Sequence, residues 1–164
     1  FRILDQKGQI EFAGDDLDSA ASTCDDILVY ANSLAEAPPS VAEEARDSYV
    51  QAVNSLGRIQ FNQDQPEAAL VLFREEIKIR EQITRLRPYD PEEKVALADA
   101  FSMAAQCLEE ELEIATSRSL AILYLEQSIS LIGRLPSEVR NRSDVQEKVI
   151  DYNAKLSTIL EMEE

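Results

Sequence analysis

The sequence contains no histidine and no tryptophan, and only four glycines occur among its 164 residues. Without histidine, a Ser or Cys nucleophile lacks its usual imidazole base, and zinc lacks its commonest ligand. The glycines are too scattered to form a loop that cradles a phosphate; they are Gly8, Gly14, Gly57 and Gly133. We therefore expect that the chain is not an enzyme and that it binds no cofactor and no metal ion.

Cysteines and long apolar runs are also scarce. The two cysteines, Cys24 and Cys107, are too few for a disulfide framework, and both fall on apolar faces of predicted helices. We expect reduced, buried thiols and a cytoplasmic location, with a redox or metal-binding role as the alternative. No apolar stretch approaches the ~18 residues that span a bilayer, and no secretion signal opens the sequence. Because the first residue is Phe1 rather than Met, we expect either an excised piece of a larger protein or a processed product.

Basic residues are half as numerous as acidic ones. Sixteen Lys and Arg stand against 32 Asp and Glu, which gives a net charge of −16. A field of this sign repels phosphates and anionic lipids, so we expect neither nucleic acid nor a membrane as the partner. The acidity either keeps the protein soluble or attracts a basic partner. With 45% hydrophobic and 29% charged residues, the composition otherwise matches an ordinary folded protein.

The sequence repeats itself with a period of 48 to 49 residues. Residues 8–20 read GQIEFAGDDLDSA and residues 57–69 read GRIQFNQDQPEAA, so five residues recur 49 positions later. A further shift of 48 positions gives a third, degenerate copy, in which Ala105 replaces Gly57 and EEELEIATS replaces the turn between two helices. Such self-similarity indicates a stack of similar structural units.

Within each unit the apolar residues follow helical spacing, as Val50 and Val53 do. Ser40, Asp90 and Ser143 each stand three residues before a Glu or Gln, a pattern that predicts a capped helix start. The predicted helices are 1–13, 17–36, 40–62, 66–86, 91–114, 117–134 and 143–162.

Small residues recur where two paired helices would cross, and a larger side chain there would force the helix axes apart. They are Gly8, Ala20, Gly57, Ala69 and Ala105. We expect close helix packing at these positions rather than flexible glycines.

The last predicted helix has one narrow apolar stripe, formed by Val145, Val149, Tyr152, Leu156 and Ile159. A terminal repeat needs one packed face and one wet face, so we expect this helix to close the stack as a cap. A coiled coil with a partner helix is the alternative.

The segment SYVQAVNSLGRIQFNQDQPEAALVLFREEIKIREQITRLRP resembles a tetratricopeptide repeat of the long-period type found in bacterial proteins. In that pattern a Leu-Gly pair closes one helix face, a polar turn follows, an Ala opens the second helix and a Pro ends the unit. The matching residues are Leu56, Gly57, Gln63 to Gln65, Ala69 and Pro88. The first unit departs from the pattern at Lys7, and the third lacks both the Gly and the turn.

The resemblance implies an all-α, tetratricopeptide-like α-solenoid of about three antiparallel helix pairs plus a C-terminal capping helix. A single domain would span residues 1–164. Its parts would be repeat 1 at 1–39, repeat 2 at 40–88, repeat 3 at 89–136 and the capping helix at 143–162.

The resemblance also implies a concave groove lined by the first helix of each pair. Asn54 matches the asparagine with which similar repeats hold a peptide backbone, because an amide both donates and accepts. Arg58 would grip a carboxylate through two parallel hydrogen bonds. The alternative is that Phe12 and Phe61 belong to the core and that Asn54 and Arg58 are ordinary wet residues. The groove candidates are Arg2, Asp5, Gln9, Phe12, Gln51, Asn54, Arg58, Phe61, Asp99, Ser102, Gln106 and Glu109.

Charged residues elsewhere are expected on the wet surface. Glu76 with Arg80, and Glu81 with Arg85, have the four-residue spacing of helical ion pairs. The basic side chains of this helix could instead attract an acidic partner. An acidic run is expected to be a solvated face rather than a cation site; it comprises Glu109, Glu110, Glu111 and Glu113.

We therefore expect a non-enzymatic interaction module, a scaffold or adaptor that binds a protein or peptide segment in its groove. It would be the regulatory part of a larger protein, and another domain of that protein could be the partner. The alternative is a sensory receptor domain that binds a small peptide or metabolite in a closed pocket and switches an attached effector. Fold resemblance alone does not decide between the two.

Overall fold

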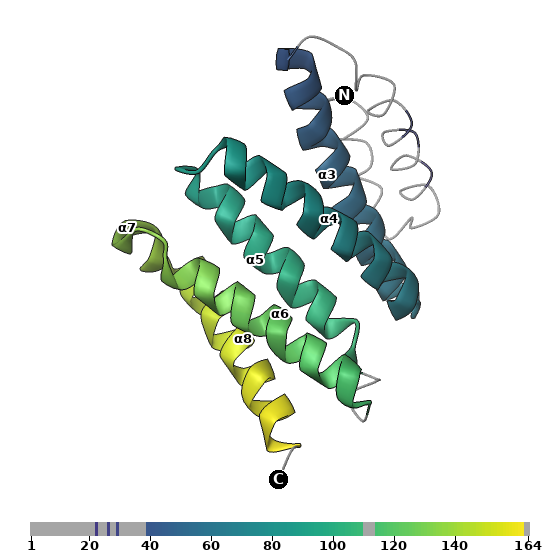
Figure 1. The fold of residues 1–164 in the computed structure, drawn as a ribbon, viewed down its shortest axis with the longest axis vertical. Helices are drawn as coiled ribbons and strands as arrows, with labels where there is room; N and C mark the ends of the chain where they lie inside the picture. Colours follow the sequence, from purple (N-terminus) through teal and green to yellow (C-terminus); the bar gives the residue numbers. More distant parts are fainter. Residues whose placement is uncertain (1–21, 23–25, 27–28, 30–38, 110–113, 163–164) are drawn as a thin grey trace. The chain divides into compact units, whose positions relative to one another are not determined.

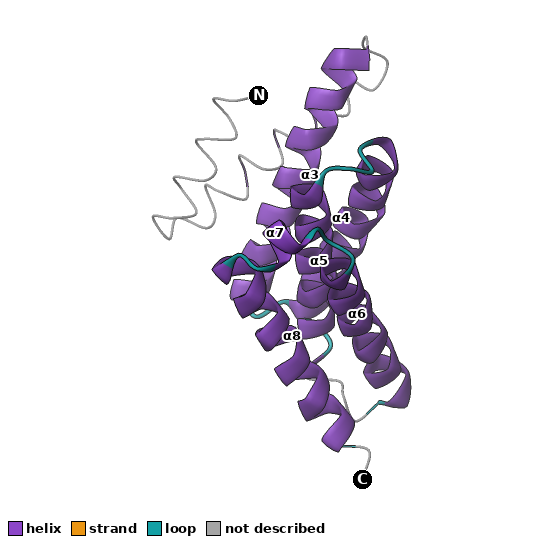
Figure 2. Ribbon diagram, turned by 90° about the vertical axis from the view of Figure 1, so that its left-hand side faces the viewer, coloured by secondary structure: helices purple, strands orange, loops and turns teal. Residues whose placement is uncertain are grey.

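The computed structural model describes residues 22, 26, 29, 39–109 and 114–162, and within them the regular secondary structure is helical throughout (Figures 1 and 2). The helices are α3 (Pro39–Asn62), α4 (Pro66–Leu86), α5 (Pro91–Gln106), α6 (Ala115–Gly133), α7 (Ser137–Arg140) and α8 (Ser143–Glu161). The chain forms two compact units, Phe1–Ile79 (unit 1) and Arg80–Glu164 (unit 2). For the described residues, the prediction of an all-α protein is confirmed. None of these helices has both the length and the apolar content to span a bilayer.

In unit 1, α3 packs against the first part of α4 through small and apolar side chains. Val50 and Val53 of α3 are at most 2% exposed, and Ala69 and Phe73 of α4 are fully buried. A Cβ atom added at Gly57 would lie 3.0 Å from Cε1 of Phe73, a distance that side chains do not normally reach. The predicted close packing at Gly57 is therefore confirmed.

The polar turn between α3 and α4 spans Gln63 to Gln65, as predicted. Asp64 has a φ of 60°, in the left-handed region that aspartate tolerates better than most residues. The backbone N–H of Gln65 donates to the carbonyl oxygen of Gln60 at 3.0 Å, which satisfies one of the last carbonyls of α3.

In unit 2, α5 packs against α6, and α6 packs against α8 (Figure 1). The buried hydroxyl of Ser128 donates to the carbonyl oxygen of Ala98 at 2.8 Å and so joins α6 to α5. From α8, Val145, Tyr152 and Ile159 are at most 4% exposed. Three of the five stripe residues are thus buried within their own unit, and Val149 and Leu156 are half-buried.

The helix ends differ from the prediction around α5, α6 and α7. The prediction that α5 continues to residue 114 is wrong, because α5 ends at Gln106. There the buried Cys107 and Leu108 turn the chain, and the N–H of Leu108 donates to the carbonyl oxygen of Ala105 at 3.0 Å. Burial of these two side chains overrides the local helix propensity on which the longer prediction rested. The short helix α7 lies in a connection for which no helix was predicted.

The predicted helix caps have different outcomes. Asp90 caps α5 as expected, since its carboxylate accepts the backbone N–H groups of Glu92 at 3.0 Å and Glu93 at 3.2 Å. The prediction for Ser143 is wrong, because it is already the first residue of α8 and Arg142 occupies the N-cap position. α3 begins at Pro39, one residue before the predicted start.

Several predictions fall outside the described part of the chain. They concern the helices 1–13 and 17–36 of repeat 1, the small residues Gly8 and Ala20, the thiol of Cys24, and the acidic residues Glu110, Glu111 and Glu113.

Candidate functional site

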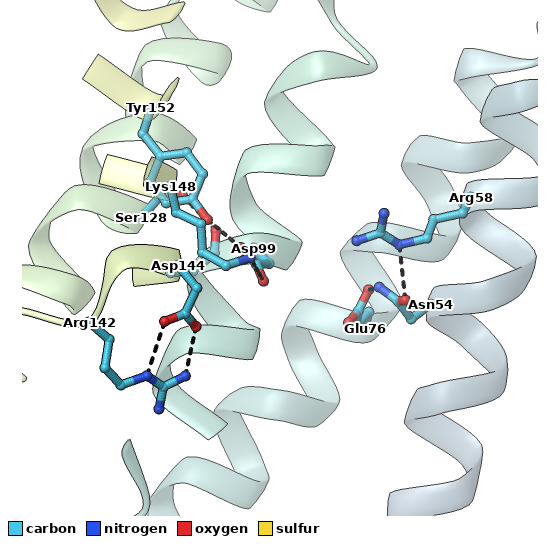
Figure 3. Close-up of polar contacts among 10 residues, drawn as sticks. Asn54, Arg58, Glu76, Asp99, Ser128, Arg142, Asp144, Lys148 and Tyr152 are labelled. Carbon is cyan, nitrogen blue, oxygen red and sulfur yellow. Dashed lines mark hydrogen bonds and ion pairs between the residues drawn. The ribbon is translucent and has the colours of Figure 1, made fainter. Parts of the chain in front are cut away.

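Three polar side chains of unit 1 form a linked cluster across α3 and α4, which we call the Asn54 cluster (Figure 3). The amide nitrogen Nδ2 of Asn54 donates to Oε2 of Glu76 at 2.9 Å. The amide oxygen Oδ1 of Asn54 accepts from Nε of Arg58, one helical turn further along α3, at 3.2 Å. Both ends of the Asn54 amide are therefore fixed, and through it Glu76 orients the Arg58 guanidinium.

The buried member of the Asn54 cluster is a carboxylate. Glu76 is 1% exposed, and an ionised group at that depth requires hydrogen bonds and nearby positive charge. Asn54 and Arg58 supply a hydrogen bond and a cation on the α3 side. Both are half-buried, so the cluster reaches from the core of unit 1 toward its surface.

The Asn54 cluster keeps hydrogen-bonding capacity for a ligand. Among the described residues, no hydrogen bond involves Nη1 or Nη2 of Arg58, and these two nitrogens form one edge of the guanidinium fork. The Asn54 amide also retains one N–H and one oxygen lone pair. The open edge of the Arg58 guanidinium can bind a carboxylate while the Asn54 amide binds a peptide group, because the cluster holds both side chains in a fixed geometry.

The predicted ion pairs of α4 have opposite outcomes. Arg85 and Glu81 form the expected exposed pair at 3.4 Å. Glu76 and Arg80, in contrast, are 1% and 4% exposed, so the expectation that they lie on the wet surface is wrong. Arg80 pairs with Glu93 of α5 at 2.9 Å. Four-residue spacing identifies side chains that share a helix face, but it does not say whether that face is covered.

A second polar cluster, the Asp99 cluster, lies within unit 2 and joins α5 to α8 (Figure 3). Nζ of Lys148 donates to both carboxylate oxygens of Asp99, at 2.8 and 2.6 Å. The hydroxyl of Tyr152 donates to the same carboxylate. The Asp99 carboxylate is therefore occupied by two side chains of α8.

The start of α8 is tied to α5 by a surface ion cluster. Nε and Nη2 of Arg142 donate to the two carboxylate oxygens of Asp144, at 3.1 and 2.7 Å, and Nη1 donates to Glu92. The hydrogen bonds from Arg142 lower the pKa of Asp144.

The one described cysteine is a buried thiol. Cys107 is 5% exposed, and burial raises the pKa of its thiol to about 12, with the nearby charge of Glu109 as a second cause. A thiol that stays protonated at neutral pH is a poor nucleophile and a poor metal ligand. The structure thus favours the predicted structural role for Cys107.

The remaining groove candidates lie on α3 and near the end of α5. Gln51 is exposed, and Phe61 and Gln106 are half-buried. Ser102 is 4% exposed, so its hydroxyl is not available at the surface. The candidates of the first predicted repeat lie outside the described residues; they are Arg2, Asp5, Gln9 and Phe12.

Sequence reasoning missed a cavity of about 370 Å³ in unit 2, where α6, α7 and α8 meet. The apolar lining residues belong to α6 and α8. The polar lining residues belong to α7, to the residue that follows α7 and to the first turn of α8. The lining residues are Ile129, Ile132, Gly133, Arg140, Asn141, Gln146, Val149 and Ile150. Because no helix was predicted at α7, the sequence contained no signal for the wall that α7 provides.

Within the described ranges, no group of three or more Cys, Asp or Glu residues is arranged to hold a metal ion. No family model matches the chain, and no curated protein is significantly similar to it in sequence. The geometry of the two units therefore supplies the arguments for function.

Proposed function

We propose that the chain is a tetratricopeptide-like interaction module that binds a segment of a partner protein through the partly exposed face of α3 that carries Asn54 and Arg58. The observation that carries the proposal is the Asn54 cluster, in which a buried carboxylate and an amide orient Arg58 while its Nη1 and Nη2 edge bears no hydrogen bond among the described residues. The partner would place a carboxylate at Arg58 and a peptide group at Asn54.

Two further observations support a repeat-type scaffold. Gly57, which the 49-residue recurrence singles out, lies where α3 contacts Phe73 of α4 too closely for a larger residue, as the repeat pattern leads one to expect. The candidate residues of α3 also follow steps of three and four, which puts Gln51, Asn54, Arg58 and Phe61 on one face. A regulatory role in a larger cytoplasmic protein, including contact with another domain of that protein, is part of the same proposal.

The decisive variant is Arg58→Gln, which removes the cation but avoids placing a second carboxylate beside Glu76. It should weaken binding of a partner segment by about 1.5 to 3 kcal/mol, the range for a charge-assisted hydrogen bond left unmade, or roughly 10- to 150-fold in Kd. Partners captured from a lysate of the source organism would be titrated calorimetrically against the wild-type and variant chains.

The matched control is Lys78→Gln on α4, which removes the same charge from an exposed side chain whose recorded partner is Glu75 of the same helix. Arg58→Lys, which keeps the charge but loses the planar fork, should fall between Arg58→Gln and the wild type. Equal losses for the Lys78 and Arg58 variants would move the binding site away from the α3 face.

A further inference from the structure

The cavity of unit 2 is lined by buried and half-buried apolar residues, by the exposed Ile150 and by exposed polar residues. Ile132 of α6 is 1% exposed, whereas Arg140, Asn141 and Gln146 are exposed. At about 370 Å³ the cavity lies near the lower limit of ordinary ligand sites, so it suits a small molecule rather than a folded segment.

Gly133 is an exposed residue that lines this cavity. Its φ is not positive, so its backbone conformation does not require glycine. A Cβ atom added there would meet no atom within 4 Å, so close packing does not require glycine either. Alanine is the better helix former, yet glycine stands here, where an added side chain would enter open space beside the cavity lining.

The one charged residue in the lining of the cavity has the sign opposite to the net charge of the protein. Acidic residues outnumber basic ones by 32 to 16, yet none of the lining residues is acidic and Arg140 is basic. Nη1 of Arg140 donates to the carbonyl oxygen of Gly133 at 3.1 Å, which holds the guanidinium at the cavity. In the described part of the chain, Nε and Nη2 of Arg140 take part in no hydrogen bond. These donors can form hydrogen bonds with a carboxylate, as can the side-chain amides of Asn141 and Gln146, which also line the cavity.

We propose that this cavity binds a small amphipathic carboxylate, whose apolar body lies against Ile129, Ile132 and Val149 and whose carboxylate meets Arg140. The site is independent of the α3 face, because its residues all belong to unit 2. Arg140 selects the anionic head group, and the size of the cavity limits the length of the apolar body.

Octanoate is the probe, and octanol is the control ligand with the same apolar chain and no charge. Both would be titrated into the full chain while the methyl resonances of Ile129 and Ile132 are followed by NMR. We expect saturable octanoate binding that is at least tenfold tighter than octanol binding. Arg140→Gln should weaken octanoate binding by about tenfold or more and leave octanol binding unchanged. Arg134→Gln, a nearby exposed cation that does not line the cavity, should change neither.

Two variants test the location of the ligand. Gly133→Leu should abolish binding of both ligands without lowering the thermal midpoint, because the added side chain enters free space. Ile150→Glu places a negative charge at a 69% exposed lining position and should selectively weaken octanoate binding. The proposal is overturned if no binding saturates below about 5 mM, if octanol binds as tightly as octanoate, or if neither of these variants weakens octanoate binding.

Discussion

Gly57 in unit 1 and Gly133 in unit 2 both lie within helices, but their surroundings differ. The ring of Phe73 lies 3.0 Å from the place where a side chain at Gly57 would begin, whereas no atom lies within 4 Å of that place at Gly133. At Gly57 the small residue allows α3 and α4 to touch. Gly133 lines the cavity of unit 2, and an added side chain there would enter open space. One glycine therefore serves packing, whereas neither packing nor backbone conformation requires the other.

The polar clusters of the two units differ in a parallel way. Glu76 in unit 1 is buried and holds Asn54 and Arg58 in a geometry that leaves guanidinium donors open. Asp99 in unit 2 has its carboxylate occupied by Lys148 and Tyr152 of α8. The first cluster retains open hydrogen-bond donors, and the second fastens one helix to another.

The largest effect on stability is expected at the close helix crossing of unit 1. Gly57→Leu should destabilise the protein by about 2 to 4 kcal/mol, because Phe73 and both helices must move to admit the side chain. Urea unfolding followed by circular dichroism measures the change, and Gly57→Ala should give a smaller loss. An unchanged midpoint for Gly57→Leu would refute the close crossing.

A smaller loss is expected at the Asp99 cluster. Asp99→Ala removes the acceptor of both Lys148 and the nearly buried Tyr152, which should cost about 1 to 3 kcal/mol. Lys148→Ala should cost less than about 1 kcal/mol, because the Lys148–Asp99 ion pair is 34% and 27% exposed and is screened by solvent. Urea unfolding of the Asp99→Ala and Lys148→Ala variants at low and at high salt would compare their two losses of stability. Equal losses for the two variants would mean that the exposed ion pair, rather than Tyr152, dominates.

The comparison of the two glycines also predicts a gain. Gly133→Ala should stabilise the protein by up to about 1 kcal/mol, because alanine restricts the unfolded chain and its methyl group meets open space. The thermal midpoint would rise slightly. A lower midpoint would show that the wall of the cavity closes on this position in solution.

The features that could be predicted from the sequence depend on residues close together in the chain. Helical spacing, the turn around Asp64 and the cap at Asp90 are local patterns, and the repeat placed Gly57 at a crossing. The spacing of Asn54 and Arg58 likewise put them on one face of α3.

The remaining features depend on tertiary contacts that no local pattern contains. The bond from Asn54 to Glu76 crosses from one helix to the next, and Glu76 was expected to be wet. The contact of Asp99 with Lys148 joins residues that are 49 positions apart. The cavity required α7, a single helical turn too short to leave a periodic signal.

The smallest effect is expected at the surface pair of Arg142 and Asp144. Hydrogen bonds from Arg142 lower the pKa of Asp144 in the folded protein below the value of about 4 that an unfolded chain has. The stability that this carboxylate contributes is therefore present above about pH 4 and is lost as the pH falls through the lowered pKa. Asp144→Asn should destabilise the protein slightly at neutral pH, and the difference from wild type should shrink in acid. Urea unfolding from neutral to acid pH measures this difference in stability. The control for net charge is Glu147→Gln, at an exposed position of the same helix. A difference that stays constant in acid would show that the charge of Asp144 contributes nothing to the tie between α5 and α8.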